Sequence, residues 1–476
     1  MKNISELRRE LDNGEITKEK LFEESTKAAI DTQEEYNCFV TIMDKYDEVD
    51  SNSMVSGIPY ALKDNISTKG ILTTASSNIL ANYVPVYDAT IYKKLKASGA
   101  LLVGKTVLDE LAMGGTGTTG HTGIVRNPWD KDRLIGGSSA GSAAAVAMGI
   151  VPFAIGSDTG DSIRKPAAYG GVVGFKPTYG KISRYGLFAF ASSLDHLGVF
   201  SRCVRDVAIV TDIVKGHDSH DMTSLPDDNK NYVRELDNDV RGRKLFYIKE
   251  ALENKDNDKD LEKVLDNFYE TVKKCEDLGI EVSGESIDKE LLLALYPTYM
   301  SISCAEVTSN DANLTGIHFG VRGEGNTPDE IIRDARTKGF SELIKRRFVL
   351  GSYILQRENQ EKLFLNACRV RRMVVERVNE LFTKYDGIIM PAAASIAPRF
   401  DNNSGDKLSD KYLILDNHLV IGNFGGFPSI TIPSGLVDKM PVAINITGRV
   451  NEDDVVLNMA NKIEEVLEFD KLREMK

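Results

Sequence analysis

The sequence predicts an α/β fold, because helical segments alternate with short buried strands along most of its 476 residues. Two segments show this alternation clearly. Residues 88–98 (DATIYKKLKAS) look helical and end at Gly99, a residue typical of helix C-termini, and residues 101–103 then form a short apolar strand. Farther along, residues 142–148 form a helix of small side chains, and a buried strand at 151–155 follows.

The remaining elements continue this alternation on either side of a polar stretch. Residues 1–50 are predicted to form N-terminal helices with a charged outer face, and residues 57–216 contain short apolar runs and Gly-rich turns. Residues 217–243 are Asp/Asn-rich and are interpreted as a surface connection. Beyond it, helices are predicted at 261–278, 356–385 and 455–467, and strands at 244–248, 387–390, 429–433 and 442–446. We expect one domain over residues 1–476, in which residues 244–476 complete the sheet and contribute to the substrate pocket.

The composition excludes several classes of protein. The chain is 42% hydrophobic and 27% charged, with 39 glycines and 14 prolines, which excludes a disordered or fibrous chain. No apolar run approaches the ~18 residues of a membrane span, and the opening MKNISELRRELDNGEITKEK is too polar for a signal peptide. We therefore expect a soluble, cytoplasmic protein.

The formal net charge of −12 argues against direct binding of nucleic acid, because proteins that neutralise phosphates usually carry a basic stripe. One group of arginines lies in the long helical segment before residue 385: Arg369, Arg371, Arg372 and Arg377. Their acidic neighbours favour a solvated helix face.

The cysteines also argue against a metal or disulfide framework. All five are widely scattered: Cys38, Cys203, Cys275, Cys304 and Cys368. There is no CxxC pair and no Cys/His ligand spacing, so we expect reduced thiols and no metal site.

Two motif matches lack the structural context that their chemistry requires. Residues 99–106 (GALLVGKT) fit the Walker A pattern, but a P-loop follows a strand, whereas this segment follows a predicted helix. Residues 137–141 (GSSAG) fit the GxSxG nucleophile elbow with Ser139 at its centre, yet the preceding residues 127–133 are polar and turn-like. The histidines later in the chain share no motif: His196, His217, His220, His318 and His418. The sequence therefore disfavours both a P-loop and an α/β-hydrolase.

Three segments concentrate small residues, hydroxyl groups and one lysine. They are residues 57–65 (GIPYALKDN), 136–145 (GGSSAGSAAA) and 156–167 (GSDTGDSIRKPA). Each alone is a weak indication, because a Gly/Ser-rich segment is usually only a turn and a lysine after apolar residues usually reaches toward solvent. In this order and at these spacings they closely resemble the amidase signature family, over residues 57–200 and more faintly to the C-terminus.

The resemblance implies a large mixed sheet flanked by helices on both faces, and a Ser–cis-Ser–Lys triad that cleaves carboxamides through an acyl-enzyme. It places the nucleophile at Ser162, the bridging serine at Ser138 and the base at Lys63. A serine hydroxyl is a weak nucleophile until a base removes its proton, and lysine can be that base only when uncharged. The apolar run 58–62 is consistent with a buried lysine, although Asp64 would oppose its deprotonation if it pointed inward.

The tetrahedral intermediate of such a reaction carries an oxyanion, which requires backbone N–H donors. By the resemblance, four consecutive residues supply them: Thr159, Gly160, Asp161 and Ser162. A helix predicted to begin near Ile163 would add its dipole. The family pattern has Gly in place of Asp161 and commonly Gln in place of Lys165. A carboxylate beside a developing anion is unfavourable unless it turns away, and pairing with Lys165 would turn it away.

Further segments resemble one branch of the family, the A subunits of glutamyl-tRNA(Gln)/aspartyl-tRNA(Asn) amidotransferases. These segments are 175–180 (FKPTYG), 183–187 (SRYGL), 189–195 (AFASSLD) and 344–351 (IKRRFVLG). The resemblance implies a chain that hydrolyses glutamine and passes ammonia to a B subunit, while a small C subunit braces the pair. On the B subunit, ATP and Mg²⁺ activate misacylated Glu-tRNA or Asp-tRNA. This chain itself is therefore expected to hold no cofactor.

A glutamine pocket needs a cation for the α-carboxylate and an anion for the α-ammonium, besides the triad. The resemblance assigns these roles to Arg347 and Asp416, and it places Tyr299 in the lining of the pocket. The alternative interpretations are a surface ion pair for Arg347 and a loop cap for Asp416.

Two other functions stay open at this point. One is a free-standing amidase that acts on another small carboxamide, which would work at full rate without partners. The other is a catalytically impaired amidase-like scaffold in a translation complex. Asp161 is the only support for the scaffold, whereas the intact residues Lys63, Ser138 and Ser162 argue against it.

Overall fold

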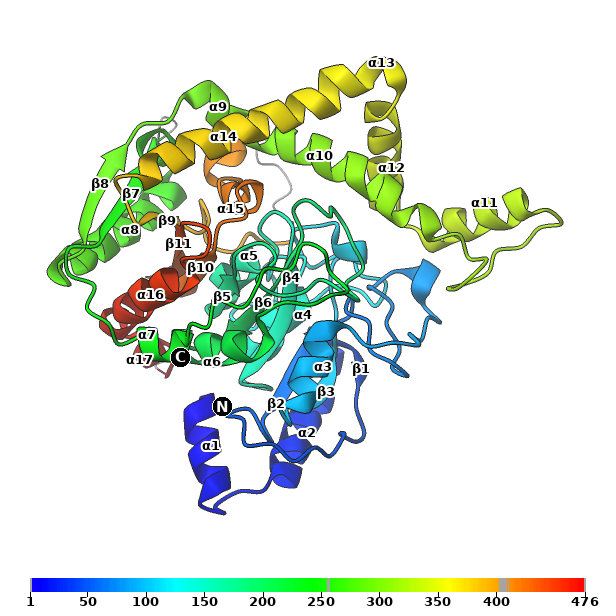
Figure 1. Cartoon of the computed structure of the whole chain (residues 1–476), viewed down its shortest axis with the longest axis horizontal. Coiled ribbons are helices and arrows are strands. Elements are labelled where there is room, and N and C mark those ends of the chain that lie inside the picture. The colour runs from blue at the N-terminus through cyan, green and yellow to red at the C-terminus, as the bar shows by residue number, and fades with distance from the viewer. Residues whose placement is uncertain (1, 255–256, 402–408, 410, 475–476) are drawn as a thin grey trace.

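The strands of the computed structural model, which describes residues 2–254, 257–401, 409 and 411–474, form one eleven-stranded sheet (Figure 1). Their order across the sheet is β1-β3-β2-β4-β6-β5-β10-β11-β9-β7-β8. They are β1 (Phe39–Ile42), β2 (Pro59–Lys63), β3 (Leu101–Thr106), β4 (Phe153–Asp158), β5 (Val173–Lys176), β6 (His196–Ser201), β7 (Lys244–Ile248), β8 (Glu281–Glu285), β9 (Gly387–Pro391), β10 (Ser429–Val437) and β11 (Met440–Gly448).

The sheet is mixed, as the resemblance implied. Strands β3, β2 and β4 are parallel, and so are β9, β7 and β8. The strands between these two groups pair antiparallel, and β1 is an antiparallel edge strand on β3. Because β2 and β4 are parallel neighbours, with Leu62 opposite Ile155, their carboxyl ends meet at the same edge of the sheet.

Helices cover both faces of the sheet. They are α1 (Ile4–Asp12), α2 (Lys18–Tyr36), α3 (Thr90–Ala97), α4 (Ala140–Ala147), α5 (Arg164–Gly170), α6 (Val204–Val214), α7 (Tyr232–Glu235), α8 (Lys259–Asp277), α9 (Lys289–Leu293), α10 (Leu295–Asn310), α11 (Pro328–Gly339), α12 (Glu342–Ile354), α13 (Arg357–Gln360), α14 (Asn366–Phe382), α15 (Val420–Phe424), α16 (Asp453–Leu467) and α17 (Phe469–Glu474). The pleat of β4 divides its side chains between two cores: Phe153 and Ile155 join one cluster, and Ala154 joins another built with α2 and α4. The predicted α/β class is confirmed.

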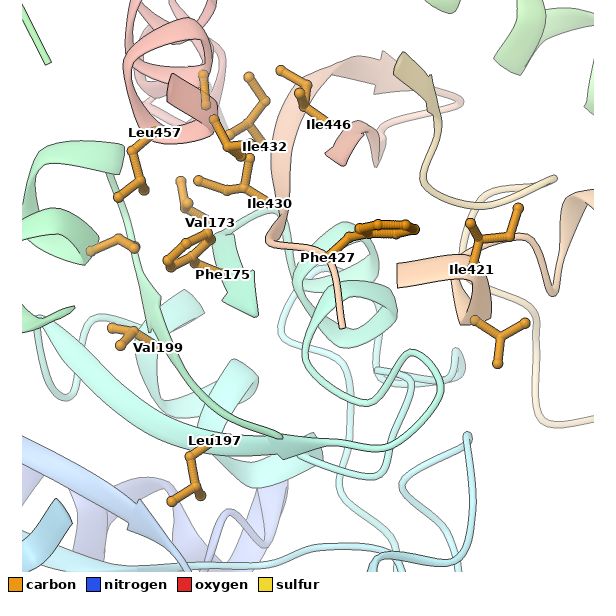
Figure 2. Close-up of a cluster of buried hydrophobic side chains, with 14 of the residues drawn as sticks. Val173, Phe175, Leu197, Val199, Ile421, Phe427, Ile430, Ile432, Ile446 and Leu457 are labelled. Carbon is orange, nitrogen blue, oxygen red and sulfur yellow. The ribbon is translucent and has the colours of Figure 1, made fainter. Parts of the chain in front are cut away.

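The larger core extends across the middle of the sheet (Figure 2). There Phe175 of β5 and Ile430 of β10 pack near Leu457 of α16, and all three side chains are fully buried. Each fully buried aliphatic or aromatic side chain contributes roughly 1.5–3 kcal/mol relative to exposure. The same core includes Leu62 of β2 and Phe153 of β4, the strands at whose ends the site lies.

Most predicted elements are present with shifted boundaries. The main departure lies in residues 1–50, where two helices are followed by the strand β1 (Phe39–Ile42). The helix predicted at 356–385 consists of α13, a π-helical turn (Glu361–Leu365) and α14. Residues 101–106 are strand and follow α3, which confirms that the Walker A match is not a P-loop.

The arginine group on α14 is largely a solvated face, as predicted. Arg369, Arg372 and Arg377 pair with glutamates at exposed positions. Arg371 differs, because its guanidinium turns inward and donates to Ser193 and to the carbonyl of Phe424. All five cysteines are free.

Helices α10, α12 and α14 form an upper layer in Figure 1, and α11 reaches outward from it. Helix α10 packs against both α12 and α14. This layer carries Tyr299 on α10 and Arg347 on α12, two of the residues predicted to bind substrate.

Candidate active site

Lys63 is the last residue of β2, between two parallel neighbouring strands. Its side chain is fully buried, and its Nζ lies 2.7 Å from Ser138 Oγ. The structure therefore brings the predicted base and the predicted bridging serine into hydrogen-bond contact. The carboxylate of Asp64 is directed away from Lys63 and toward other partners: its Oδ1 lies 3.4 Å from the Nζ of Lys105, and its Oδ2 accepts from Thr74. Asp64 therefore does not pair with Lys63 and does not hold it in the charged form.

Two further hydroxyl groups contact the same amine. Ser139 Oγ lies 2.8 Å and Ser157 Oγ 2.9 Å from Lys63 Nζ. Ser139 donates its own proton to the carbonyl of Ser157 at 3.0 Å, so toward Lys63 it acts as an acceptor. An uncharged amine has two N–H donors and one lone pair. With the donors directed to Ser139 and Ser157, the lone pair faces the Ser138 O–H, which is the orientation that a base requires.

The protonation of Lys63 is set mainly by its burial. Burial lowers the pKa of the ammonium to about 7, although the carboxylates of Asp109, Asp158 and Asp195 act in the opposite direction. Near neutral pH a large fraction of the lysine is therefore uncharged. This is the property that a general base in this position needs.

The loop that carries Ser138 is held by Asp109. The peptide bond between Gly137 and Ser138 is cis, and the Ser138 carbonyl accepts from the backbone N–H of Asp109 at 3.1 Å. The Asp109 carboxylate in turn accepts from four consecutive backbone N–H groups: Thr116, Gly117, Thr118 and Thr119. A Cβ on Gly137 would lie 2.0 Å from Asp109 Oδ2, so no larger residue fits there.

Ser162 lies in the loop between β4 and α5, and it is 4% exposed. Its backbone carbonyl accepts from the N–H of Ser139 at 3.2 Å, which ties the loop of the predicted nucleophile to the loop of the bridging serine. The resulting assembly contains Lys63 at a strand end, with Ser138 and Ser162 on two loops that are bonded to each other.

The same loop presents a row of free backbone donors. Within the part of the chain that the structure describes, no acceptor is bonded to the N–H groups of Thr159, Gly160, Asp161 and Ser162. The next N–H, that of Ile163, is already bonded to the Asp158 carboxylate at 2.9 Å. Unpaired N–H groups beside a serine are the donors that an oxyanion hole requires.

A buried ion pair fixes this row of donors. The guanidinium of Arg164 bonds both carboxylate oxygens of Asp158, at 3.1 and 3.0 Å, and both side chains are fully buried. The same guanidinium donates to the carbonyl of Gly160 at 2.8 Å, which orients the adjoining peptide. On the other side of the loop, Thr159 Oγ1 donates to Asp195 at 2.7 Å.

Arg347 lacks a carboxylate partner among the described residues. Its Nε is buried without a hydrogen bond in that part of the chain, its Nη1 contacts the Met300 sulfur at 3.9 Å, and the guanidinium also interacts with the thiol of Cys304. The guanidinium lies 5.5 Å from the ring centre of Phe190. Within the described residues, the alternative of a surface ion pair for Arg347 is therefore not supported. A half-buried cation without a counter-ion is suited to an anionic ligand.

Tyr299 packs against the loop of free donors. Its ring atoms lie 3.0 Å from the point where a Cβ on Gly160 would be, so this close approach depends on glycine. Burial raises the pKa of the Tyr299 hydroxyl; the positive charge of Arg347 opposes this change and the negative charge of Asp161 adds to it. Tyr299 thus lies within the electrostatic reach of both charges.

Asp416 and Lys165 form an ion pair that the sequence did not predict. Lys165 Nζ lies 3.5 Å from Asp416 Oδ1 and 3.0 Å from the Asp416 carbonyl oxygen. The carboxylate within ion-pair distance of Lys165 is that of Asp416 and not that of Asp161, although Lys165 is still the strongest charge acting on Asp161. Asp416 Oδ1 also accepts from the N–H of Ala394 at 3.2 Å.

Several positioning residues could not be identified from the sequence. Ser157 and Asn65 complete the contacts around the amine, with Asn65 Nδ2 donating to Ser157 Oγ at 3.0 Å. Asp109 and the Asp158–Arg164 pair position the two loops. All of these except Asp109 lie within the quoted segments, but nothing in a single sequence distinguishes an inward polar side chain there from a turn residue.

The described residues contain no group of three or more His, Cys, Asp or Glu side chains arranged to hold a metal ion. In the same part of the chain, no helix is long and apolar enough to cross a membrane.

A family model described as Amidase matches residues 20–457, and the chain belongs to the amidase family. Similar proteins include the A subunits of glutamyl-tRNA(Gln) amidotransferases. The one from Lactobacillus johnsonii is 38% identical over 470 residues, which is 97% of this chain and 96% of its own length. The one from Lactiplantibacillus plantarum is 40% identical over 414 residues, 86% of this chain and 83% of its own length.

Solved structures agree with this assignment. The A subunit of glutamyl-tRNA(Gln) amidotransferase from Thermotoga maritima is 34% identical, with a TM-score of 0.80 over 98% of this chain and 94% of that one. A peptide amidase from Stenotrophomonas maltophilia, at 22% identity, has a TM-score of 0.83 over 98% and 97% of the two chains. The second likeness supports the fold alone.

Proposed function

We propose that this chain is the glutamine-hydrolysing subunit of a tRNA-dependent amidotransferase. The observation that carries the proposal is the 2.7 Å contact between the buried Lys63 amine and Ser138, in a site with free N–H donors and an unpaired Arg347. The likeness to the A subunits of glutamyl-tRNA(Gln) amidotransferases over nearly the whole chain supports the choice of glutamine among carboxamides.

The proposed reaction begins with attack of Ser162 Oγ on the side-chain carbonyl of glutamine. The Ser162 proton passes to Ser138, whose own proton passes to Lys63, while an O–C bond forms and the carbonyl oxygen becomes an oxyanion. The free N–H groups of residues 159–162 stabilise that oxyanion. The C–N bond then breaks as the proton returns through Ser138 to the leaving nitrogen, which departs as ammonia and leaves a γ-glutamyl ester on Ser162.

Water completes the cycle. It attacks the ester carbon and gives its proton to Lys63 through Ser138. The tetrahedral intermediate collapses with cleavage of the O–C bond to Ser162, which regains a proton, and glutamate is released. The same donors stabilise the second oxyanion, so one site serves both steps.

Arg347 is proposed to bind the α-carboxylate of glutamine, and Tyr299 to line the pocket beside it. We expect Arg347→Met to raise KM for glutamine by about one to two orders of magnitude, since a charge-assisted hydrogen bond contributes roughly 1.5–3 kcal/mol. Steady-state ammonia release measures the effect. Arg346→Met, which removes the exposed neighbouring arginine on α12, is the control and should leave KM unchanged. Equal effects of the two substitutions would contradict the assignment.

The partners are proposed from the relatives. A B subunit would hold ATP, Mg²⁺ and the misacylated Glu-tRNA or Asp-tRNA, and a C subunit would brace the complex. The net charge of −12 fits a chain that leaves the tRNA to its partner, in the cytoplasm.

The proposal is tested by assaying the chain alone and with co-purified B and C subunits. We expect glutamine hydrolysis to rise about tenfold or more in the complex with ATP and misacylated tRNA, because coupling between sites usually has this size. A full rate without partners would indicate a free-standing amidase. Failure of a glutamine-mimicking electrophile to label the complex would indicate an inactive scaffold.

A further inference from the structure

The ion pair between Lys165 and Asp416 changes what the pocket offers to a substrate. The Lys165 side chain is 8% exposed and that of Asp416 25%, so the pair is mostly shielded from water. Two donors already engage Asp416 Oδ1: the Lys165 ammonium and the N–H of Ala394. Lys165 therefore largely neutralises the negative charge of Asp416, which weakens the attraction of Asp416 for a second cation.

Asp161 is the carboxylate that remains available. It immediately precedes Ser162, and no hydrogen bond from the described residues acts on its side chain. Burial raises the pKa of Asp161 to about 6, and the negative charges of Asp158 and Asp416 add to this increase, whereas Lys165 and Arg164 oppose it. An ionised carboxylate in such a place gains from a cationic partner.

Among the described residues, Arg347 and Asp161 are charges of opposite sign that form no ion pair in this part of the site, although Lys165 attracts Asp161 from farther away. The ring of Tyr299, which packs against Gly160 beside Asp161, is within the electrostatic influence of both charges. A ligand that carries a carboxylate and an ammonium group complements this arrangement, as a free α-amino acid does.

We propose that Asp161 receives the α-ammonium group of the substrate, while Lys165 keeps Asp416 from that role. The inference rests on the proposed glutaminase function and assigns a specificity-determining residue to it. The bound ammonium also neutralises Asp161 beside the oxyanion, so the carboxylate repels the developing charge only when the substrate lacks that group.

Glutaramate is glutamine without its α-ammonium group. It separates the binding of that group by Asp161 from the repulsion between Asp161 and the oxyanion. The wild-type complex should hydrolyse glutamine at least tenfold more efficiently, in kcat/KM, than glutaramate. Asp161→Asn keeps the shape and removes the charge, so it should raise KM for glutamine about tenfold and increase kcat for glutaramate. The preference for glutamine should then largely disappear.

A double substitution provides the matched control. Asp161→Gly alone should weaken glutamine binding as Asp161→Asn does, whereas Asp161→Gly combined with Lys165→Gln releases Asp416 and should bring KM back to within about threefold of wild type. An unchanged preference in Asp161→Asn would overturn the inference and leave the glutaminase function standing. A wild-type complex that releases no ammonia from either compound would overturn both.

Discussion

Ser162→Ala should reduce glutamine hydrolysis by about four orders of magnitude or more, because no other hydroxyl can form the acyl-enzyme in its place. Ser138 and Ser139 lie near, but both are fully buried; the Ser138 hydroxyl contacts Lys63, and the Ser139 hydroxyl donates to the carbonyl of Ser157. The variant should also lose covalent labelling by a glutamine-mimicking electrophile, which mass spectrometry of the intact chain detects. Labelling that persists would remove Ser162 from the role of nucleophile.

Ser192→Ala is a suitable control, because Ser192 is exposed and lies outside the loops of the triad. It should keep full activity and labelling. In the assembled complex, external ammonium should restore tRNA amidation to Ser162→Ala, since ammonia then no longer has to come from glutamine. Failure of this rescue in an intact complex would contradict the proposed division of labour between subunits.

Lys63→Ala should lower kcat by several orders of magnitude, because the attacking hydroxyl then has no base. In the wild type, Lys63 is charged below its pKa of about 7 and uncharged above it. The rate should therefore rise with pH through a midpoint near 7. Loss of this acid limb in Lys63→Ala, measured as kcat/KM against pH, would identify the lysine as the group responsible. A variant that kept most of its rate would exclude Lys63 from the mechanism.

Lys105 provides the matched control, since it is another fully buried lysine whose pKa is lowered by burial. Its Nζ bonds the carbonyl of Ile66 and the hydroxyl of Thr73, and it pairs with Asp64. Lys105→Met is expected to lower stability by leaving Asp64 without its cation. The midpoint of the pH profile should stay the same, which separates the catalytic lysine from a structural one.

The alternation of helices and strands could be predicted because it follows from local patterns. Gly99 after an amphipathic segment and the apolar run that follows it are sufficient to place α3 and β3. Strand β1 could not be recognised in the same way. It has only four residues, directly follows the long helix α2, and owes its existence to pairing with β3, about sixty positions away in the chain.

The same distinction between local sequence patterns and tertiary contacts applies to the residues of the site. The order and spacing of three segments resembled the amidase family, and that resemblance implied the roles of Lys63, Ser138 and Ser162, but it did not indicate Asp416 as the ion-pair partner of Lys165. Four residues apart, Asp161 and Lys165 would meet on a helix, yet α5 begins only at Arg164, so Asp161 precedes it. The actual partner, Asp416, is 251 positions away and comes close only through tertiary packing.

Two positions near Ser162 that are uncharged in the family pattern, 161 and 165, carry charges in this chain, and this has an evolutionary consequence. Relative to the family pattern, Asp161 adds one negative charge and Lys165 one positive charge within the same largely buried region. Lys165 alone would occupy Asp416 and leave no free carboxylate for the ammonium group, whereas Asp161 alone would add a second free carboxylate near Asp416. Homologous sequences that carry an acidic residue at the first position should therefore carry a basic one at the second, as a jointly inherited pair.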